Sequence, residues 1–349
     1  MRWSFLRRLA TTGRITMPRF QMTSTLQSLA RRNFLRIRYL LTRDVLWTTT
    51  VGLRDFPSVV PAGLAMTERK FIPYTPSFRT CLDATHTVAD PFLFVHEGAL
   101  FLFAERMTFL RHGEIVAYRS TDLEHWEHLG TVLRERHHLS YPNVFTYEGC
   151  SYMLPEGAAS GCLWLYRAED AGLTRWTRVR TLLEGRYYDP TLVMQDDRVY
   201  LFATDGDKRL RLFHAVGLFG EFCEHPESPV TSDSRYARCG GPVIEDLSGR
   251  RWRLSQDGTR GYGEDLYLNE IVRIGPETYV EAPGAHPLPR IVRRKGTLGM
   301  HHCSTATFGG IPVMATDAKE LDSLANLLVK PYWQVAKLWR RRGRVSQRS

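Results

Sequence analysis

The stretch ADPFLFVHEGALFLFAE (89–105) decides the fold, because two runs of alternating apolar residues flank a short polar turn. Alternation with a period of two is typical of β-strands, and the turn His96-Glu97-Gly98 predicts a hairpin. The hairpin opens on the dipeptide Asp90-Pro91 and ends on the acidic residue Glu105.

The same pattern returns four more times along the chain. The further copies are SYPNVFTYEGCSYMLPE (140–156), YDPTLVMQDDRVYLFATD (188–205), GGPVIEDLSGRRWRLSQD (240–257) and MHHCSTATFGGIPVMATD (300–317). The first four of the five copies share a proline, and these prolines lie about 50 residues apart, whereas the last copy is weaker and lacks it. Repeats of this length, each followed by further short strands, are typical of the blades of a β-propeller.

We therefore predict an all-β fold, a five-bladed β-propeller over residues 46–317 with a short C-terminal helix and basic terminal extensions (1–45 and 318–349). Residues 46–85 are expected to be irregular, because four prolines interrupt them. The helix is expected over AKELDSLANLLVK (318–330), capped by Asp317 and stopped by Pro331. The alternative is a β-sandwich whose segments resemble one another by chance.

The formal net charge of +10 is concentrated at the two ends of the chain. No acidic residue precedes Asp44, and the segment YWQVAKLWRRRGR (332–344) is aromatic and basic. The acidic middle argues against a nucleic-acid partner. Three interpretations of the N-terminal segment stay open: an arm on a membrane surface, an organelle transit peptide, or a start codon placed ahead of Met17 or Met22. The C-terminal segment either contacts an anionic membrane or packs on the propeller.

Composition excludes several classes of protein. The hydrophobic content of 43% excludes global disorder, and no apolar run reaches the roughly 20 residues that a membrane-spanning helix needs. The six cysteines form no C-x-x-C pair, so neither a zinc cluster nor a redox motif is indicated. Because we find no secretory signal, we expect a cytoplasmic protein with peripheral contact at the inner membrane face.

Equivalent positions of the repeats should converge, because the first strand of each blade lines the central channel of a propeller. The positions that open these strands hold Asp90, Tyr141, Asp189, Gly241 and the pair His301-His302, and the ends of the second strands add Glu105, Glu156, Asp205 and Asp257. Carboxylates are seldom buried unless they are paired or functional. Paired carboxylates suit the chemistry of glycosidic bonds, and tyrosines such as Tyr188 offer flat faces to sugar rings. The structural alternative is that Asp-Pro merely starts a strand.

These residues resemble a known group of proteins. ADPF (89–92), YDPT (188–191) and GMHHCS (299–304) look like the five-bladed propellers of glycoside hydrolase family 43. The pattern as a whole resembles more closely the N-terminal domain of glucosamine inositolphosphorylceramide transferases and their standalone bacterial relatives. The segments that carry this resemblance lie within about residues 86–317 and are VADPFLF, HHLSYPNVF, YYDPTLV, HPESPV, ARCGGPV and GYGEDLYLNEI.

The resemblance to family 43 implies roles for individual residues. Asp90 would match the general base, Asp189 the aspartate that orients the acid, and His302 the channel histidine near a bound ion or water. The blade-four triplet that carries the general acid in those hydrolases is Gly240-Gly241-Pro242 here, so a substitute is sought among Glu156, Glu264 and Glu270. The expected sugar-binding residues are Tyr141, Glu105, Tyr188, Asp205, Arg238, Asp257, His301 and His302.

Three hypotheses of function follow. The first is an enzyme that hydrolyses or transfers glycosidic bonds of a glycan or glycolipid through the channel carboxylates. The second is a non-catalytic sugar-binding propeller that assists a separate glycosyltransferase in polysaccharide or glycolipid assembly. The third, a protein-interaction propeller, predicts no convergent carboxylates. The expected ligand is a carbohydrate or lipid-linked sugar, and no cofactor or transition metal is expected, apart from an ion near His302.

Overall fold

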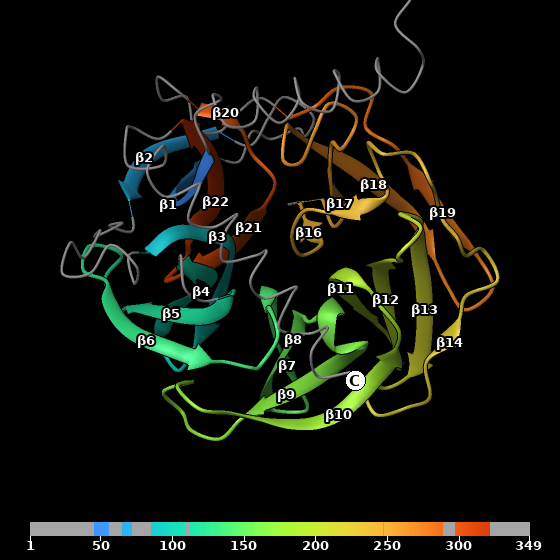
Figure 1. The fold of residues 1–349 in the computed structure, drawn as a ribbon, viewed down its shortest axis with the longest axis horizontal. Coiled ribbons are helices and arrows are strands. Elements are labelled where there is room, and N and C mark those ends of the chain that lie inside the picture. Colours follow the sequence, from blue (N-terminus) through green and yellow to red (C-terminus); the bar gives the residue numbers. More distant parts are fainter. Residues whose placement is uncertain are drawn as a thin grey trace, which may run out of the picture. The chain divides into compact units, whose positions relative to one another are not determined.

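The computed structural model describes residues 45–55, 65–71, 85–108, 112–246, 248–288 and 297–321. Within these ranges every element is a β-strand except one turn of 3-10 helix, Ala158–Ser160. The inner strand of each repeat contacts the next: β3 contacts β7, β7 contacts β11, β11 contacts β15, and β21 returns to β3. The prediction of an all-β propeller is therefore confirmed (Figure 1). No helix in the described part of the chain has the length and apolar character that crossing a membrane requires.

Three of the sheets correspond to single repeats. One contains β7 (Ser140–Tyr147), β8 (Cys150–Glu156), β9 (Cys162–Ala168) and β10 (Trp176–Glu184). The next contains β11 (Tyr188–Gln195), β12 (Arg198–Thr204), β13 (Leu210–Val216) and β14 (Cys223–Glu224). The third contains β15 (Arg238–Cys239), β16 (Ile244–Glu245), β17 (Arg251–Gln256), β18 (Leu266–Ile274) and β19 (Tyr279–Ala282).

The remaining sheet has nine strands and combines the first and the last repeats. It contains β1 (Val45–Asp55), β2 (Ala65–Phe71), β3 (Thr85–His96), β4 (Ala99–Thr108), β5 (Glu114–Ser120), β6 (Glu127–Leu133), β20 (Thr297–Gly299), β21 (Cys303–Phe308) and β22 (Ile311–Leu321). A parallel pair between Trp47 and Thr87 joins β1 to β3. The prediction of five blades is therefore wrong for the described residues, which form four sheets, because this pair merges the strands of two repeats.

Two local predictions also fail. The segment 46–85 was expected to be irregular, but it contains β1 and β2, and β1 pairs with β22 from Val45↔Leu321 to Leu53↔Val313. The predicted helix does not begin at 318, because residues up to Leu321 continue strand β22. The continuous buried run from Val313 to Ala318 and the pairing with strand β1 outweigh the capping signal of Asp317. The rest of the predicted helix and residues 1–44 lie outside the described residues.

The residue before each repeat proline adopts the left-handed conformation. The φ angles of Asp90, Tyr141 and Asp189 are 51°, 47° and 50°, and that of Gly241 is 140°. At each of the three non-glycine positions the strand carries one extra residue relative to its partner, which is a β-bulge. Left-handed backbone is uncommon for residues other than glycine, and its recurrence at three equivalent positions points to a functional constraint.

Candidate functional site

Four acidic side chains gather where the inner strands open. The bulges place Asp90 and Asp189, and the neighbouring strands β4 and β8 place Glu105 and Glu156. All four are buried, with exposed fractions of 3%, 2%, 7% and 6% for Asp90, Asp189, Glu105 and Glu156. Each of Glu105 and Glu156 feels the charges of both aspartates. The structure thus brings together four carboxylates that the repeat alignment aimed at one channel mouth.

One half of this site, which we call the Arg238 cluster, consists of Glu156, Asp189, Arg238 and Gln256. Arg238 donates from Nε to Oδ2 of Asp189 (2.5 Å) and from Nη2 to Oδ1 of Asp189 (3.3 Å) and to Oε2 of Glu156 (3.5 Å). The amide of Gln256 donates to Oδ2 of Asp189 (2.8 Å). One permanent cation therefore serves two buried carboxylates, and a fork of two hydrogen bonds fixes Asp189.

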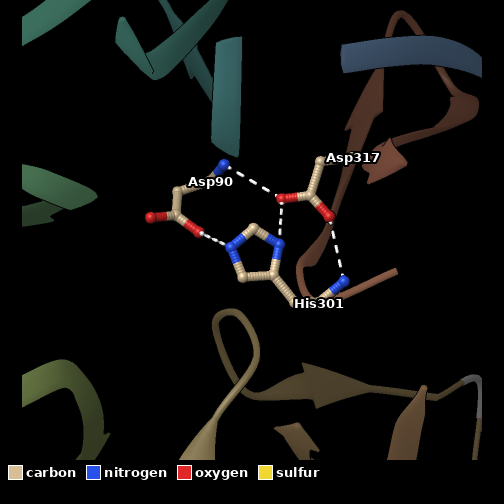
Figure 2. A group of neighbouring side chains, drawn as sticks. All are labelled: Asp90, His301 and Asp317. Carbon is tan, nitrogen blue, oxygen red and sulfur yellow. Dashed lines mark hydrogen bonds and ion pairs between the residues drawn. The ribbon is translucent and has the colours of Figure 1, made fainter. Parts of the chain in front are cut away.

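The other half, the His301 cluster, consists of Asp90, His301 and Asp317. Figure 2 shows the imidazole ring between the two carboxylates, with Nδ1 2.6 Å from Oδ2 of Asp317 and Nε2 3.3 Å from Oδ1 of Asp90. Asp317 also accepts hydrogen bonds from the backbone N–H groups of Asp90 (3.1 Å), His301 (3.0 Å) and His302 (3.0 Å). The last strand β22 thereby positions both the opening residue of β3 and the ring of His301.

The His301 cluster favours a charged ring. Burial by itself lowers the pKa of His301, but the carboxylates of Asp317 and Asp90 outweigh burial and raise this pKa to about 9. Burial raises the pKa of Asp90 to about 7 against the opposing effect of His301. Burial likewise favours neutral Asp317, yet the contacts with His301 lower its pKa below the usual value. At neutral pH the ring is therefore an imidazolium between two acids.

The same three residues are the one group in the described ranges whose ligand atoms lie close enough, within 4.8 Å of one another, to hold a metal ion. Their arrangement does not fit a resident metal, because each ring nitrogen of His301 already faces a carboxylate oxygen. A metal needs a ring nitrogen that offers its lone pair.

Glu105 has a different partner from the other acids. His138 places Nε2 3.3 Å from Oε1 of Glu105, and its Nδ1 accepts a hydrogen bond from the backbone N–H of Gly113 (2.9 Å). Burial raises the pKa of Glu105 well above its usual value and lowers that of His138 to about 4. In the sequence, His138 lies in the segment HHLSYPNVF that carries part of the family resemblance, and it was not among the predicted site residues.

Tyr141 and His302 touch this acidic group through their backbone, since the N–H of Tyr141 donates to Oδ2 of Asp90 (3.1 Å) and that of His302 to Oδ1 of Asp317 (3.0 Å). Tyr141 is fully buried, and its hydroxyl contacts Thr191 (2.7 Å) and both accepts from the N–H of Gly241 (2.9 Å) and donates to its carbonyl (2.8 Å). The ring of His302 packs against Phe92 and Tyr141, with centroids 4.6 and 5.2 Å away, and its nitrogens have no hydrogen-bond partner among the described residues. Burial lowers the pKa of His302 to about 3. The expected ion near His302 stays a prediction.

Three predicted site residues lie elsewhere. Asp205 closes a turn with Arg209, Asp257 accepts from the N–H (2.8 Å) and hydroxyl (2.6 Å) of Thr259, and Glu270 pairs with Trp252 and Ala282 in the ladder of β18. The spacing from the repeat prolines shows why: Thr204 and Gln256 lie as far after Pro190 and Pro242 as Glu105 and Glu156 lie after Pro91 and Pro142, one residue before the two aspartates. Counting residues from each proline, rather than matching acidic residues, identifies Gln256.

Two aromatic residues that sequence analysis missed border the site. The ring of Trp47 lies 3.9 Å from that of His301, and Tyr262 contacts both rings edge-on at 5.9 and 4.9 Å. Tyr262 is 47% exposed and also lies 5.0 Å beneath the guanidinium of Arg238, while Tyr188 lies 5.6 Å from it. Gly263 permits this contact, because a Cβ there would lie 2.3 Å from the Trp47 ring. A half-exposed aromatic face beside carboxylates is suited to a sugar ring.

The fold defines the class of the protein, a β-propeller with an acidic site at the start of its inner strands. The catalytic domain of the GH62 α-L-arabinofuranosidase from Coprinopsis cinerea superposes with a TM-score of 0.50, covering 79% of this chain and 98% of that chain. The two share 15% sequence identity, so the likeness concerns the fold alone.

Sequence comparison places the chain more narrowly. The profile of the family described as glucosamine inositolphosphorylceramide transferase 1, N-terminal, matches residues 77–297, and the chain belongs to this family. This confirms the family resemblance that the repeats suggested.

The similar curated proteins are plant glucosamine inositolphosphorylceramide transferases 1. The protein of Oryza sativa subsp. japonica is 37% identical over 207 residues, covering 56% of this chain and 28% of the relative. That of Arabidopsis thaliana is 33% identical over 230 residues, covering 60% and 30%. The chain thus spans less than a third of the length of these relatives. The expected kinship with standalone bacterial proteins finds no support among them.

Proposed function

We propose that the propeller binds a sugar residue at its acidic site and processes a glycan or a glycolipid. The observation that carries the proposal is the charge balance of the site. Five buried carboxyl groups (Asp90, Glu105, Glu156, Asp189 and Asp317) face, among the described residues, only two cationic partners, Arg238 and His301. Buried acids without enough cations destabilise a fold, so their convergence supports ligand binding rather than packing.

The same charge balance favours a class of ligand. Carboxylates accept hydrogen bonds from sugar hydroxyls, and an excess of them attracts an ammonium group. The plant relatives are named for glucosamine, a sugar whose free amine is cationic. We therefore place an amino sugar, or a lipid-linked form of it, first among the ligands to be tried.

For an enzyme, the chemistry divides between the two halves of the site. Asp90 would accept the proton of an attacking water or alcohol, whose oxygen forms a bond to the anomeric carbon. The bond from that carbon to the leaving oxygen breaks, and a neutral carboxylic acid gives this oxygen its proton. Asp189, held by Arg238 and Gln256, would stabilise the positive charge that develops on the sugar ring.

The second candidate is a sugar-binding propeller that assists a separate glycosyltransferase. Gly240, which stands where family 43 has its general acid, favours this second candidate. A Cβ at this position would lie 2.4 Å from Cδ2 of Leu266 and 3.0 Å from the carbonyl of His301, so no acidic side chain extends from this position. The short coverage of the relatives is also consistent with a transferase activity that resides outside this region. This second proposal includes two partners. One is a glycosyltransferase, and the other is a membrane that the basic terminal segments contact peripherally from the cytoplasm.

Asparagine variants of the two aspartates test the proposal. Asp90→Asn and Asp189→Asn keep the side-chain shape, so we expect the affinity for an amino sugar or the rate of glycoside cleavage to fall by about 10²-fold or more. Asp207→Asn, in an exposed turn of the third repeat, is the matched control and should change neither. Binding is measured by calorimetry with a panel of neutral and amino sugars. Unchanged affinity and activity in both site variants, with lower melting temperatures, would reduce the two aspartates to strand-starting residues.

A further inference from the structure

We propose that Glu105 is the proton donor of this site, a carboxylic acid that the fold keeps neutral and presents to an oxygen of the bound sugar. The inference rests on the proposed function for the identity of its ligand. The neutral state itself follows from the surroundings of Glu105 alone and is tested without any ligand.

The strand places Glu105 in the site without a cation. It lies on β4 opposite Ala89, the residue before Asp90, and its side chain is 9% exposed. The next residue, Arg106, points to the other face of the strand, as alternation requires, where it donates to Glu114. Arg106, the charged residue next to Glu105 in the sequence, therefore pairs with Glu114 and not with Glu105.

The ring of His138 is held in one neutral tautomer. Nδ1 accepts the backbone N–H of Gly113, so it carries the lone pair, and the single ring proton is on Nε2. Nε2 faces Oε1 of Glu105 at 3.3 Å. Because burial lowers the pKa of His138 to about 4, the ring stays uncharged at neutral pH. It supplies a hydrogen bond to Glu105 but no positive charge.

Gly113 makes this arrangement possible. A Cβ at this position would lie 2.3 Å from the carbonyl oxygen of Leu139, and 2.7 Å from both Oε1 of Glu105 and Cε1 of His138. The N–H of Leu139 in turn donates to the carbonyl of Gly113 (3.0 Å). Two backbone segments thus approach each other closely enough to clamp the histidine against the acid, and only glycine allows this.

The other three acids of the mouth each have a cationic partner. Asp189 and Glu156 share Arg238, and Asp90 faces His301. Within the described ranges Glu105 has none at ion-pair distance, since His138 is neutral. Burial is the main cause of its raised pKa, and the charged groups that act on it are Asp90, His301, Asp317 and Asp189, of which only His301 opposes the shift.

A neutral carboxylic acid in this position has a defined use. The proton of Glu105 moves to the glycosidic oxygen as the bond between that oxygen and the anomeric carbon breaks, with the bonding electrons going to the oxygen. Glu105 becomes a carboxylate, and the water or alcohol that attacks the carbon gives its own proton to Asp90. In a binding site without catalysis, the same group donates a hydrogen bond to a sugar oxygen.

Infrared spectra of the full chain in heavy water at neutral pH test the proposal. The difference between the wild-type protein and Glu105→Gln should contain the carbonyl band of a protonated carboxylic acid, with Glu156→Gln as the matched comparison that leaves this component in place. Carboxylate bands in the wild-type minus Glu105→Gln difference would overturn the proposal.

The histidine gives a second measurement that needs no folded Glu105 variant. In ¹⁵N-labelled wild-type protein, His138 should show the neutral tautomer protonated at Nε2 throughout pH 6 to 8; a charged ring or the opposite tautomer would overturn the proposal. Calorimetry with sugars separates the two proposals. Binding with an ionised Glu105 refutes only the proton donor, whereas a neutral Glu105 in a protein that binds no sugar refutes the proposed function and leaves the protonation state standing.

Discussion

The Arg238 cluster and the His301 cluster solve the same problem with different cations. Each holds two buried carboxylates with one positive group, but a guanidinium stays charged at every pH that the fold survives, whereas an imidazolium loses its proton. The Arg238 cluster is therefore a fixed half of the site, and the His301 cluster is a titratable half.

The two clusters also differ in which parts of the chain they join. The Arg238 cluster connects successive repeats through β8, β11, β15 and β17, whereas the His301 cluster connects β3 of the first repeat to His301 and β22 of the last. The titratable cation thus lies where the last repeat contacts the first. As the pH rises, the contacts between the first and last repeats should therefore weaken before the contacts between the other repeats do.

The largest effect should come from removing the fixed cation. Arg238→Met leaves Asp189 and Glu156 without their donor, and breaking a buried ion pair costs about 3–5 kcal/mol. Because the Arg238 side chain is 32% exposed, we expect the lower end of this range. Urea unfolding measures it. Arg238→Lys keeps the charge but loses the fork, so it should lie between wild type and Arg238→Met; equal stability of all three would mean that solvent already screens these acids.

A rise in pH should weaken the other half. His301 has a raised folded-state pKa of about 9, so its contribution to stability is complete below the unfolded value of about 6.5 and disappears as pH rises through 9. Asp90, with a folded-state pKa of about 7, acts in the same direction, because its raised pKa also favours folding at lower pH. The free energy of unfolding should therefore fall by about 2–3 kcal/mol between pH 6.5 and 9.

The matched variants for this pH series are His301→Gln and Asp317→Asn. The first removes the titrating ring, so the slope should shrink. The second removes the larger of the two attractions on the ring, so the pKa of His301, followed by NMR, should fall toward about 6.5. A pH slope that is the same in wild type and His301→Gln would assign the titration to other groups.

The smallest effect on stability is expected from Tyr262, which contacts both clusters. Tyr262 contacts both the guanidinium of Arg238 and the ring of His301, yet it is half-exposed. Tyr262→Ala should change the unfolding free energy by about 0.5 kcal/mol, while sugar affinity falls about tenfold if the ring stacks on the ligand. Tyr262→Phe, which keeps the face, should bind almost as well as wild type.

The two clusters also differ in how far their residues could be predicted from the sequence. Asp90, Asp189, Glu105 and Glu156 were predictable, because the prolines set a common register and a repeat places equal positions together in space. Trp47 and the merged sheet were not, because their partners lie far away in the sequence and leave no local pattern. Asp317 ends the fifth copy of the repeat, but its position beside His301 was not predicted. Asp317 even carries a helix-capping signal, which long-range pairing of β22 with β1 overrides. Asp205 and Asp257 were wrongly matched with Glu105 and Glu156. Each of them lies one residue past the end of its strand, where it accepts hydrogen bonds within a turn.

The pairing of β1 with β22 has a consequence for the order in which the protein acquires its site. Val45 pairs with Leu321, so the first strand has to wait for the last strand to be synthesised before its backbone is satisfied. Contacts so distant in sequence are slow to form, since the chain must close a long loop first. The Arg238 cluster, made by neighbouring repeats, can assemble on a nascent chain, but Asp90 meets His301 and Asp317 only once β22 has emerged. On the ribosome this protein therefore carries an incomplete acidic site until the residues up to Leu321 have been synthesised.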